Sequence, residues 1–83
     1  MKITVTPEDI ANGVRVDPED CPVGRACNRA FRAFGKRVFV AKDRLYGLGI
    51  VVRFPSGVPE IISRFDKSGS MEPFEFDIDT EVC

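Results

Sequence analysis

The sequence predicts an α+β domain in which one four-stranded antiparallel sheet has two helices on one face. Apolar residues recur at helical spacing over residues 22–34 and again over residues 58–67. Four further segments alternate between apolar and polar residues, which is typical of strands with one buried face. The order along the chain is strand, helix, strand, strand, helix, strand, as in the ferredoxin-like β-α-β-β-α-β fold. A looser α+β arrangement is the alternative.

The chain has 83 residues, which predicts one domain over residues 1–83, and its 43% apolar content is typical of a globular protein. Basic and acidic residues nearly cancel, at 12 against 13, so the composition does not indicate a general nucleic-acid binder. No apolar run approaches the roughly 20 residues of a transmembrane helix. The N-terminus has no secretory pattern. These features lead us to expect a cytoplasmic protein with reduced thiols and no membrane partner.

The first element along the chain is a short strand that places Ile3 and Val5 on one face. A capped helical turn is expected next. Thr6 suits its N-cap, Pro7 suits its first position, and Asp9 lies three residues after the cap. This turn is an insertion in the ferredoxin-like plan.

The main helix is expected over residues 22–34, where Pro22 suits the first helical position and Gly35 suits the C-terminal stop. Its apolar face consists of Val23, Ala26, Cys27, Ala30, Phe31 and Phe34. Burial of each large apolar side chain contributes roughly 1.5–3 kcal/mol. We therefore expect this face to close the core of the domain.

Two strands are expected after this helix, over residues 36–43 and 48–54, with a turn over residues 43–47 between them. The side chains expected to face the core are those of Val38, Val40, Leu48, Ile50, Val52 and Phe54. The side chains expected on the opposite face are those of Arg37, Phe39, Val51 and Arg53.

A second helix is expected from Pro59 to residue 67, and Gly69 suits its end. Its apolar positions at helical spacing are Val58, Ile61, Ile62 and Phe65. The last strand is expected over residues 73–80. It directs Phe74, Phe76 and Ile78 inward and Glu75, Asp77, Asp79 and Glu81 outward.

Four short segments of the chain resemble a group of small uncharacterised proteins encoded by bacteriophages and prophages. They are Ile-Thr-Val-Thr-Pro-Glu-Asp-Ile at residues 3–10, Cys-Pro-Val at 21–23, Phe-Asp at 65–66 and Pro-Phe-Glu-Phe at 73–76. Pro18 stands where members of that group often have a cysteine, and Gly24, Arg25 and Cys27 interrupt their usual aliphatic run. The resemblance implies a phage context and no particular reaction. Small phage accessory proteins often block host defences by binding.

The first candidate site is a stripe of cations on the main helix. Arg25, Arg29, Arg32 and Lys36 fall within about a 60° sector at 3.6 residues per turn. Such a stripe could bind phosphates or an acidic protein surface. The alternative is a solvated helix face whose charges suit the helix dipole.

The second candidate is the open face of the sheet, where Phe39 and Val51 lie among Arg37 and Arg53. An apolar centre with a charged rim is typical of a protein-binding patch or a self-dimer interface. RNA-binding domains of this fold stack bases here, but their Gly-Phe-rich signature is absent from the chain. The alternative is two apolar residues scattered among long charged side chains.

The acidic residues of the last strand form a third candidate, which could hold a hard cation or mimic a nucleic-acid backbone. Pairing with Arg37 or Arg53 across the sheet is the interpretation that we favour. The chain has three cysteines and no histidine, which excludes Ser-His and Cys-His catalysis and indicates neither a zinc site nor a disulfide framework. Cys21 lies at a helix N-terminus, where a thiol can become reactive, Cys27 belongs to the core, and Cys83 lies at the C-terminus.

These features favour a non-enzymatic phage accessory protein, without cofactor or metal, that binds and inhibits a host factor of antiviral defence in the manner of an anti-CRISPR protein. Its partner would be a host protein or a protein–nucleic-acid complex in the host cytoplasm. One alternative is a nucleic-acid or nucleotide-binding module that uses the arginine stripe. Another is a structural homo-oligomer or minor virion protein.

Overall fold

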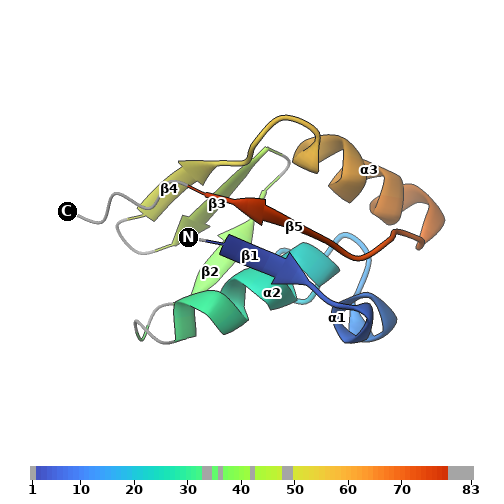
Figure 1. The fold of residues 1–83 in the computed structure, drawn as a ribbon, viewed down its shortest axis with the longest axis horizontal. Helices are drawn as coiled ribbons and strands as arrows, with labels where there is room; N and C mark the ends of the chain where they lie inside the picture. The colour runs from blue at the N-terminus through green and yellow to red at the C-terminus, as the bar shows by residue number, and fades with distance from the viewer. Residues whose placement is uncertain (1, 33–34, 36, 42, 48–49, 79–83) are drawn as a thin grey trace.

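The computed structural model describes residues 2–32, 35, 37–41, 43–47 and 50–78. The elements in chain order are β1 (Lys2–Val5), α1 (Pro7–Asn12), α2 (Pro22–Phe31), β2 (Val38–Val40), β3 (Arg44–Gly47), β4 (Ile50–Arg53), α3 (Val58–Ser68) and β5 (Phe74–Asp77). The predicted α+β class is confirmed. The strands form two antiparallel sheets, β1–β5 and β2–β3–β4. In Figure 1, α3 lies above the β1–β5 pair, and α1 and α2 lie below it.

The single four-stranded, ferredoxin-like sheet is not confirmed, because the strands are divided between these two sheets. The turn expected over residues 43–47 is largely strand β3, the central strand of the larger sheet. Its alternation covers only four residues: Leu45 is fully buried, whereas Arg44 and Tyr46 are exposed. Because β2 and β4 both pair with β3, these three strands complete a meander of their own.

The capped helical turn is confirmed as α1. Thr6 is its N-cap, and its side-chain oxygen accepts a hydrogen bond of 3.2 Å from the Asp9 amide. In return the Thr6 amide donates to Asp9 Oδ2 over 3.0 Å. This reciprocal capping box satisfies two of the backbone donors that the start of a helix leaves without a partner.

The main helix begins at Pro22 as predicted, and Cys21 caps it by accepting a hydrogen bond from the Gly24 amide over 3.2 Å. The structure describes this helix to Phe31, and residues 33–34 lie outside the described part of the chain. The buried apolar residues of its inner face are Val23, Ala26, Cys27 and Phe31. The helix packs against β1 and β2, so it contacts both sheets.

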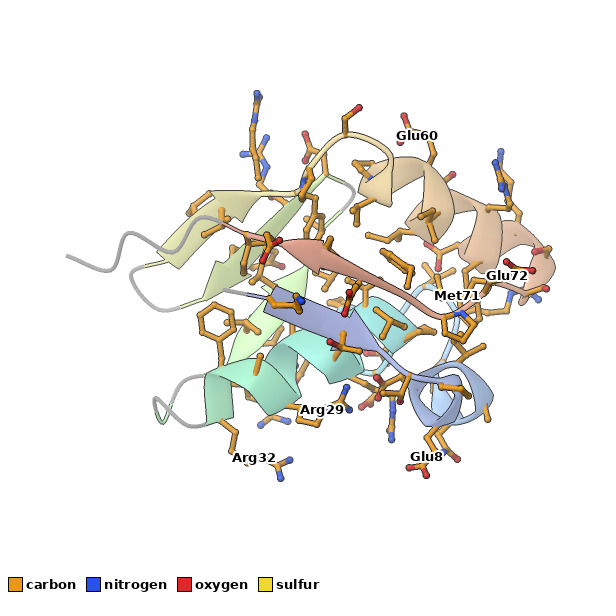
Figure 2. The ribbon with its side chains drawn as sticks, viewed as in Figure 1. Glu8, Arg29, Arg32, Glu60, Met71 and Glu72 are labelled. Atoms are coloured by element: carbon orange, nitrogen blue, oxygen red, sulfur yellow. The ribbon has the colours of Figure 1, made fainter. Side chains whose placement is uncertain are left out.

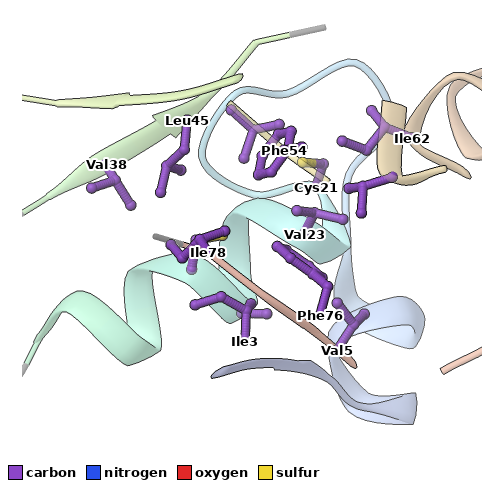
Figure 3. Close-up of a cluster of buried hydrophobic side chains, with 14 of the residues drawn as sticks. Ile3, Val5, Cys21, Val23, Val38, Leu45, Phe54, Ile62, Phe76 and Ile78 are labelled. Carbon is purple, nitrogen blue, oxygen red and sulfur yellow. The ribbon is translucent and has the colours of Figure 1, made fainter. Parts of the chain in front are cut away.

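One hydrophobic cluster draws on both sheets and on α2 and α3 (Figure 3). Phe54 and Phe76 meet edge to face with ring centroids 5.7 Å apart, which joins the end of β4 to β5. Of the inward positions predicted for α3 and the last strand, Val58, Ile62, Phe65, Phe76 and Ile78 are buried. Ile61 and Phe74 are half-buried. Within the described ranges, no helix combines the length and the hydrophobicity that crossing a bilayer requires.

Candidate functional site

Arg29, the centre of the predicted arginine stripe, is bound to the fold by internal hydrogen bonds, although its side chain is half exposed. Its Nη1 and Nη2 donate to the two carboxylate oxygens of Asp9 over 2.7 Å each, and Nη2 also donates to the Thr4 carbonyl over 2.8 Å. The Asp9 side chain is only 1% exposed. Arg29 therefore ties α2 to both β1 and α1, and its guanidinium is occupied by internal contacts.

The Asp9 carboxylate is stabilised in its charged form. Burial alone would raise the pKa of Asp9, but hydrogen bonds from Arg29 and Thr6, together with the Arg29 charge, outweigh burial and lower it. The hydrogen bond to Asp9 raises the pKa of Arg29 in turn. Both groups are ionised at neutral pH, and the pair forms a structural link.

The other cations of the stripe are placed differently from one another. Arg25 directs its Nε towards Asp9 Oδ1 at 3.7 Å, and its side chain is 36% exposed. Arg32 is exposed, and no carboxylate among the described residues forms an ion pair with it. Figure 2 shows Arg32 below α2, directed away from the strands. The predicted stripe residue Lys36 lies outside the described residues.

An open groove of about 530 Å³ runs beside this helix. Its charged lining consists of four arginines, Arg25, Arg29, Arg32 and Arg37, and three carboxylates, Asp9, Glu19 and Asp20. Arg37 forms an ion pair with Glu19 at 2.5 Å. Because acidic groups share this groove with the arginines, an anion would compete with them for the same guanidinium groups.

The outer face of the three-stranded sheet carries a continuous apolar row. Phe39 pairs across the strands with Tyr46, and Tyr46 pairs with Val51. Phe39 is half-buried, Tyr46 is 41% exposed and Val51 is 69% exposed. The rings of Phe39 and Tyr46 stack with their centroids 5.6 Å apart and their planes 30° apart. We call this row, together with Arg44 and Arg53, the sheet face.

The sheet face has a local positive charge. Arg44 lies directly opposite Arg53, and like charges in such cross-strand pairs repel. One carboxylate, Asp43, lies beside them and accepts a hydrogen bond of 3.1 Å from Arg44 Nε. That bond, with the charges of Arg44 and Arg53, lowers the pKa of Asp43. Two guanidinium groups thus share one carboxylate.

The predicted positions of Phe39, Val51 and Arg53 on the outer face are confirmed. Arg37, predicted on the same face, instead lines the α2 groove, where Glu19 pairs with it. Tyr46 and Arg44 were not predicted as outer-face residues, because both fall in the segment expected to be a turn. The alternation of exposed Arg44 and Tyr46 around buried Leu45 is the signal that could have revealed them.

Neither described acidic residue of the last strand, Glu75 or Asp77, pairs with Arg37 or Arg53, so the prediction is wrong for these two residues. Strand β5 pairs with β1, where Glu75 lies opposite Thr4 and Asp77 lies opposite Lys2. Lys2 approaches Glu75 to 3.8 Å on the surface. The outward positions 79 and 81 lie outside the described residues.

The two described cysteines are packed into the core. Burial raises the pKa of the Cys21 thiol, and burial raises the pKa of Cys27 to about 12. Both thiols are therefore protonated at neutral pH, and the reactivity considered for Cys21 at the helix N-terminus is opposed by its burial. Cys83 lies outside the described residues. In the part of the chain that the structure describes, no group of three or more His, Cys, Asp or Glu side chains is placed to hold a metal ion.

Comparison of the chain with protein-family models, with curated proteins and with solved structures finds no match. The function of this chain must therefore be inferred from its own surfaces. Of the two described above, the sheet face combines exposed apolar area with unbalanced charge, and the α2 groove combines charges of both signs.

Proposed function

We propose that the protein is a non-enzymatic binding protein that docks its sheet face on a negatively charged partner. In the phage context that the resemblance implies, this partner is a host factor of antiviral defence, or a complex of such a factor with nucleic acid, and docking inhibits it. One observation carries the proposal: the exposed row Phe39–Tyr46–Val51 lies beside the like-charged pair Arg44 and Arg53.

The composition of the sheet face supports a binding role. Aromatic residues and arginine are enriched in the centres of protein interfaces and among the residues that dominate their binding energy. Val51 is 69% exposed in the middle of a strand, where a polar residue would otherwise face the solvent. The charge of Arg53 next to this row favours an acidic partner and speeds its association.

The non-enzymatic part of the proposal is supported by the state of the groups that could do chemistry. The Cys21 and Cys27 thiols are buried and protonated, and the chain contains no histidine. The buried carboxylate, Asp9, is fully occupied by Arg29 and Thr6. None of these side chains is available as a nucleophile or a general base.

A nucleotide or nucleic acid bound in the α2 groove is the second candidate function. It is favoured by Arg32, which is exposed on the groove wall without an ion pair among the described residues. It is weakened by the occupation of Arg29 and by the three carboxylates of the lining. Arg25→Glu combined with Arg32→Glu would abolish such binding and leave binding through the sheet face intact.

A homodimer through the sheet face is opposed by its charge, because a second copy would present the same Arg44 and Arg53 pair. Size-exclusion chromatography with light scattering measures this directly. We expect a monomer, and a dimer that Val51→Asp dissociates would assign the sheet face to self-association instead.

The proposed function is tested by capture of partners from a bacterial lysate, followed by identification of the bound protein and phage challenge of a defended host. We expect Val51→Asp and Tyr46→Ala to abolish capture and inhibition. The matched control is Val14→Asp, because Val14 is 50% exposed, lies in the loop between α1 and α2 and is not part of the sheet face. Equal capture by all three variants would contradict the proposed function.

A further inference from the structure

We infer that the negatively charged partner recognised by the sheet face is a single-stranded nucleic acid, with bases stacked on Phe39 and Tyr46 and phosphates bound by Arg44 and Arg53. The inference rests on the proposed function, since it names the chemistry of the partner that docks on the same face. Within a protein–nucleic-acid complex of the host, the exposed strand would be the docking point.

The aromatic part of the site is preformed. Phe39 and Tyr46 lie on adjacent strands and stack on each other, with ring planes 30° apart, and Tyr46 is the more exposed of the two rings at 41%. Every base has a π-face, and aromatic side chains on a sheet are the common means of binding unpaired bases. Val51 extends the apolar row by one strand.

The cationic part of the site lies one pleat away. Arg44 lies two residues from Tyr46 along β3, and Arg53 lies two residues from Val51 along β4. The arginine pair is therefore about 7 Å from the Tyr46–Val51 pair. This separation suits a base and the phosphate of the same strand. Among the described residues, Asp43 is the carboxylate bound to Arg44, and Arg53 acts on it only through its charge, so charge complementarity favours a partner that brings phosphates to the two arginines.

A single strand fits these observations better than the other anionic partners. A duplex keeps its bases inside the helix and could meet only the arginines. An acidic protein segment could also bind the arginines, but its carboxylates do not stack on aromatic rings. The acidic residues that give the whole chain a net charge of −1 include Glu75 and Asp77, which lie on the other sheet.

The direct experiment is fluorescence anisotropy with fluorescein-labelled oligothymidylate and oligouridylate of about 20 nucleotides, at low and at physiological salt. We expect saturable binding that weakens with salt, with a slope of about −0.7 per phosphate contact and hence about −1.4 for two contacts. The chain has one tyrosine and no tryptophan, so its intrinsic fluorescence reports on Tyr46 alone. Stacking should quench it.

Substitutions test whether the oligonucleotide binds at the sheet face. Tyr46→Ala should weaken binding roughly tenfold, the usual effect of removing one stacking ring. Arg53→Glu should weaken it and lower the salt slope by about 0.7. Asp43→Asn should strengthen it, because the competing carboxylate is removed. Arg64→Glu, at an exposed position of α3, makes the same charge change away from the site and should have no effect. Circular dichroism checks that each variant is folded.

The inference would be overturned by no anisotropy change at low salt, or by binding that Tyr46→Ala and Asp43→Asn leave unchanged. Stronger binding to a duplex than to a single strand would also overturn it. If the oligonucleotides fail to bind, but Val51→Asp abolishes capture of a host protein from a nuclease-treated lysate, the partner is an acidic protein. In that case the inference of a nucleic-acid partner fails, and the proposed binding function stands.

Discussion

Removing the Asp9 carboxylate tests the link that holds α2 to the first strand and to α1. Asp9→Asn keeps the size of the side chain but removes its charge, and it places an amide nitrogen against donors from Arg29 or Thr6. A hydrogen bond to a charged group contributes about 1.5–3 kcal/mol, and the loss of half of a capping box costs about 1 kcal/mol. We expect the free energy of unfolding to fall by about 2.5–4 kcal/mol, since Arg29 is 49% exposed and regains water.

Urea denaturation followed by circular dichroism gives this free energy directly. Glu8→Gln is the matched control, because Glu8 is an exposed carboxylate on the same short helix. A loss below about 1 kcal/mol for Asp9→Asn, or an equal loss for Glu8→Gln, would refute the reasoning.

The difference in unfolding free energy between the wild type and Asp9→Asn should depend on pH, in a direction that follows from the lowered pKa of Asp9. A carboxyl group with a lowered pKa in the folded state stabilises the protein above its unfolded pKa, and this contribution is lost as the pH falls through the folded pKa. The gap in stability between the wild type and Asp9→Asn should therefore be constant from about pH 5 to 8 and shrink below about pH 4. A gap that persists at lower pH would contradict the ion-pair account.

Three further substitutions test contacts that the sequence alone does not reveal. Asn28→Asp should lower the free energy of unfolding by about 1–3 kcal/mol, because Asn28 Nδ2 donates to the Val38 carbonyl over 3.0 Å. Gly24→Ala should lower the melting temperature despite its better helix propensity, since the new Cβ would lie 2.7 Å from the Glu19 carbonyl oxygen. Val16→Asn should raise it by relieving about 1 kcal/mol of strain at a φ of 59°. Thermal unfolding monitored by circular dichroism measures all three, and a change of opposite sign contradicts each.

Local patterns in the sequence were sufficient to predict the helices and the inward faces of β1 and β2. Helical spacing identified α2 and α3, and Thr6 with Asp9 identified the capping box of α1. Each of these signals lies within a few residues of chain. For the same reason, the outer positions of Phe39 and Val51 followed from strand alternation.

The division of the strands into two sheets could not be predicted, because strand pairing joins residues far apart in sequence. β5 pairs with β1 at the opposite end of the chain, and β3 is too short to give a clear alternation. The role of Arg29 was missed for the same reason, since its partner Asp9 lies 20 residues away. The sequence pattern of a cation on the polar side of a helix is the same in both cases, whether the cation faces solvent or a buried carboxylate.

The most direct test of the sheet face as the docking surface is quenching of Tyr46 fluorescence by iodide, in the free protein and with the captured partner bound. Tyr46 is 41% exposed on the same face as Arg44 and Arg53, so iodide should quench the free protein more strongly than caesium does. Bound partner should then protect Tyr46 from iodide. Quenching that the bound partner leaves unchanged would show that docking takes place elsewhere on the molecule.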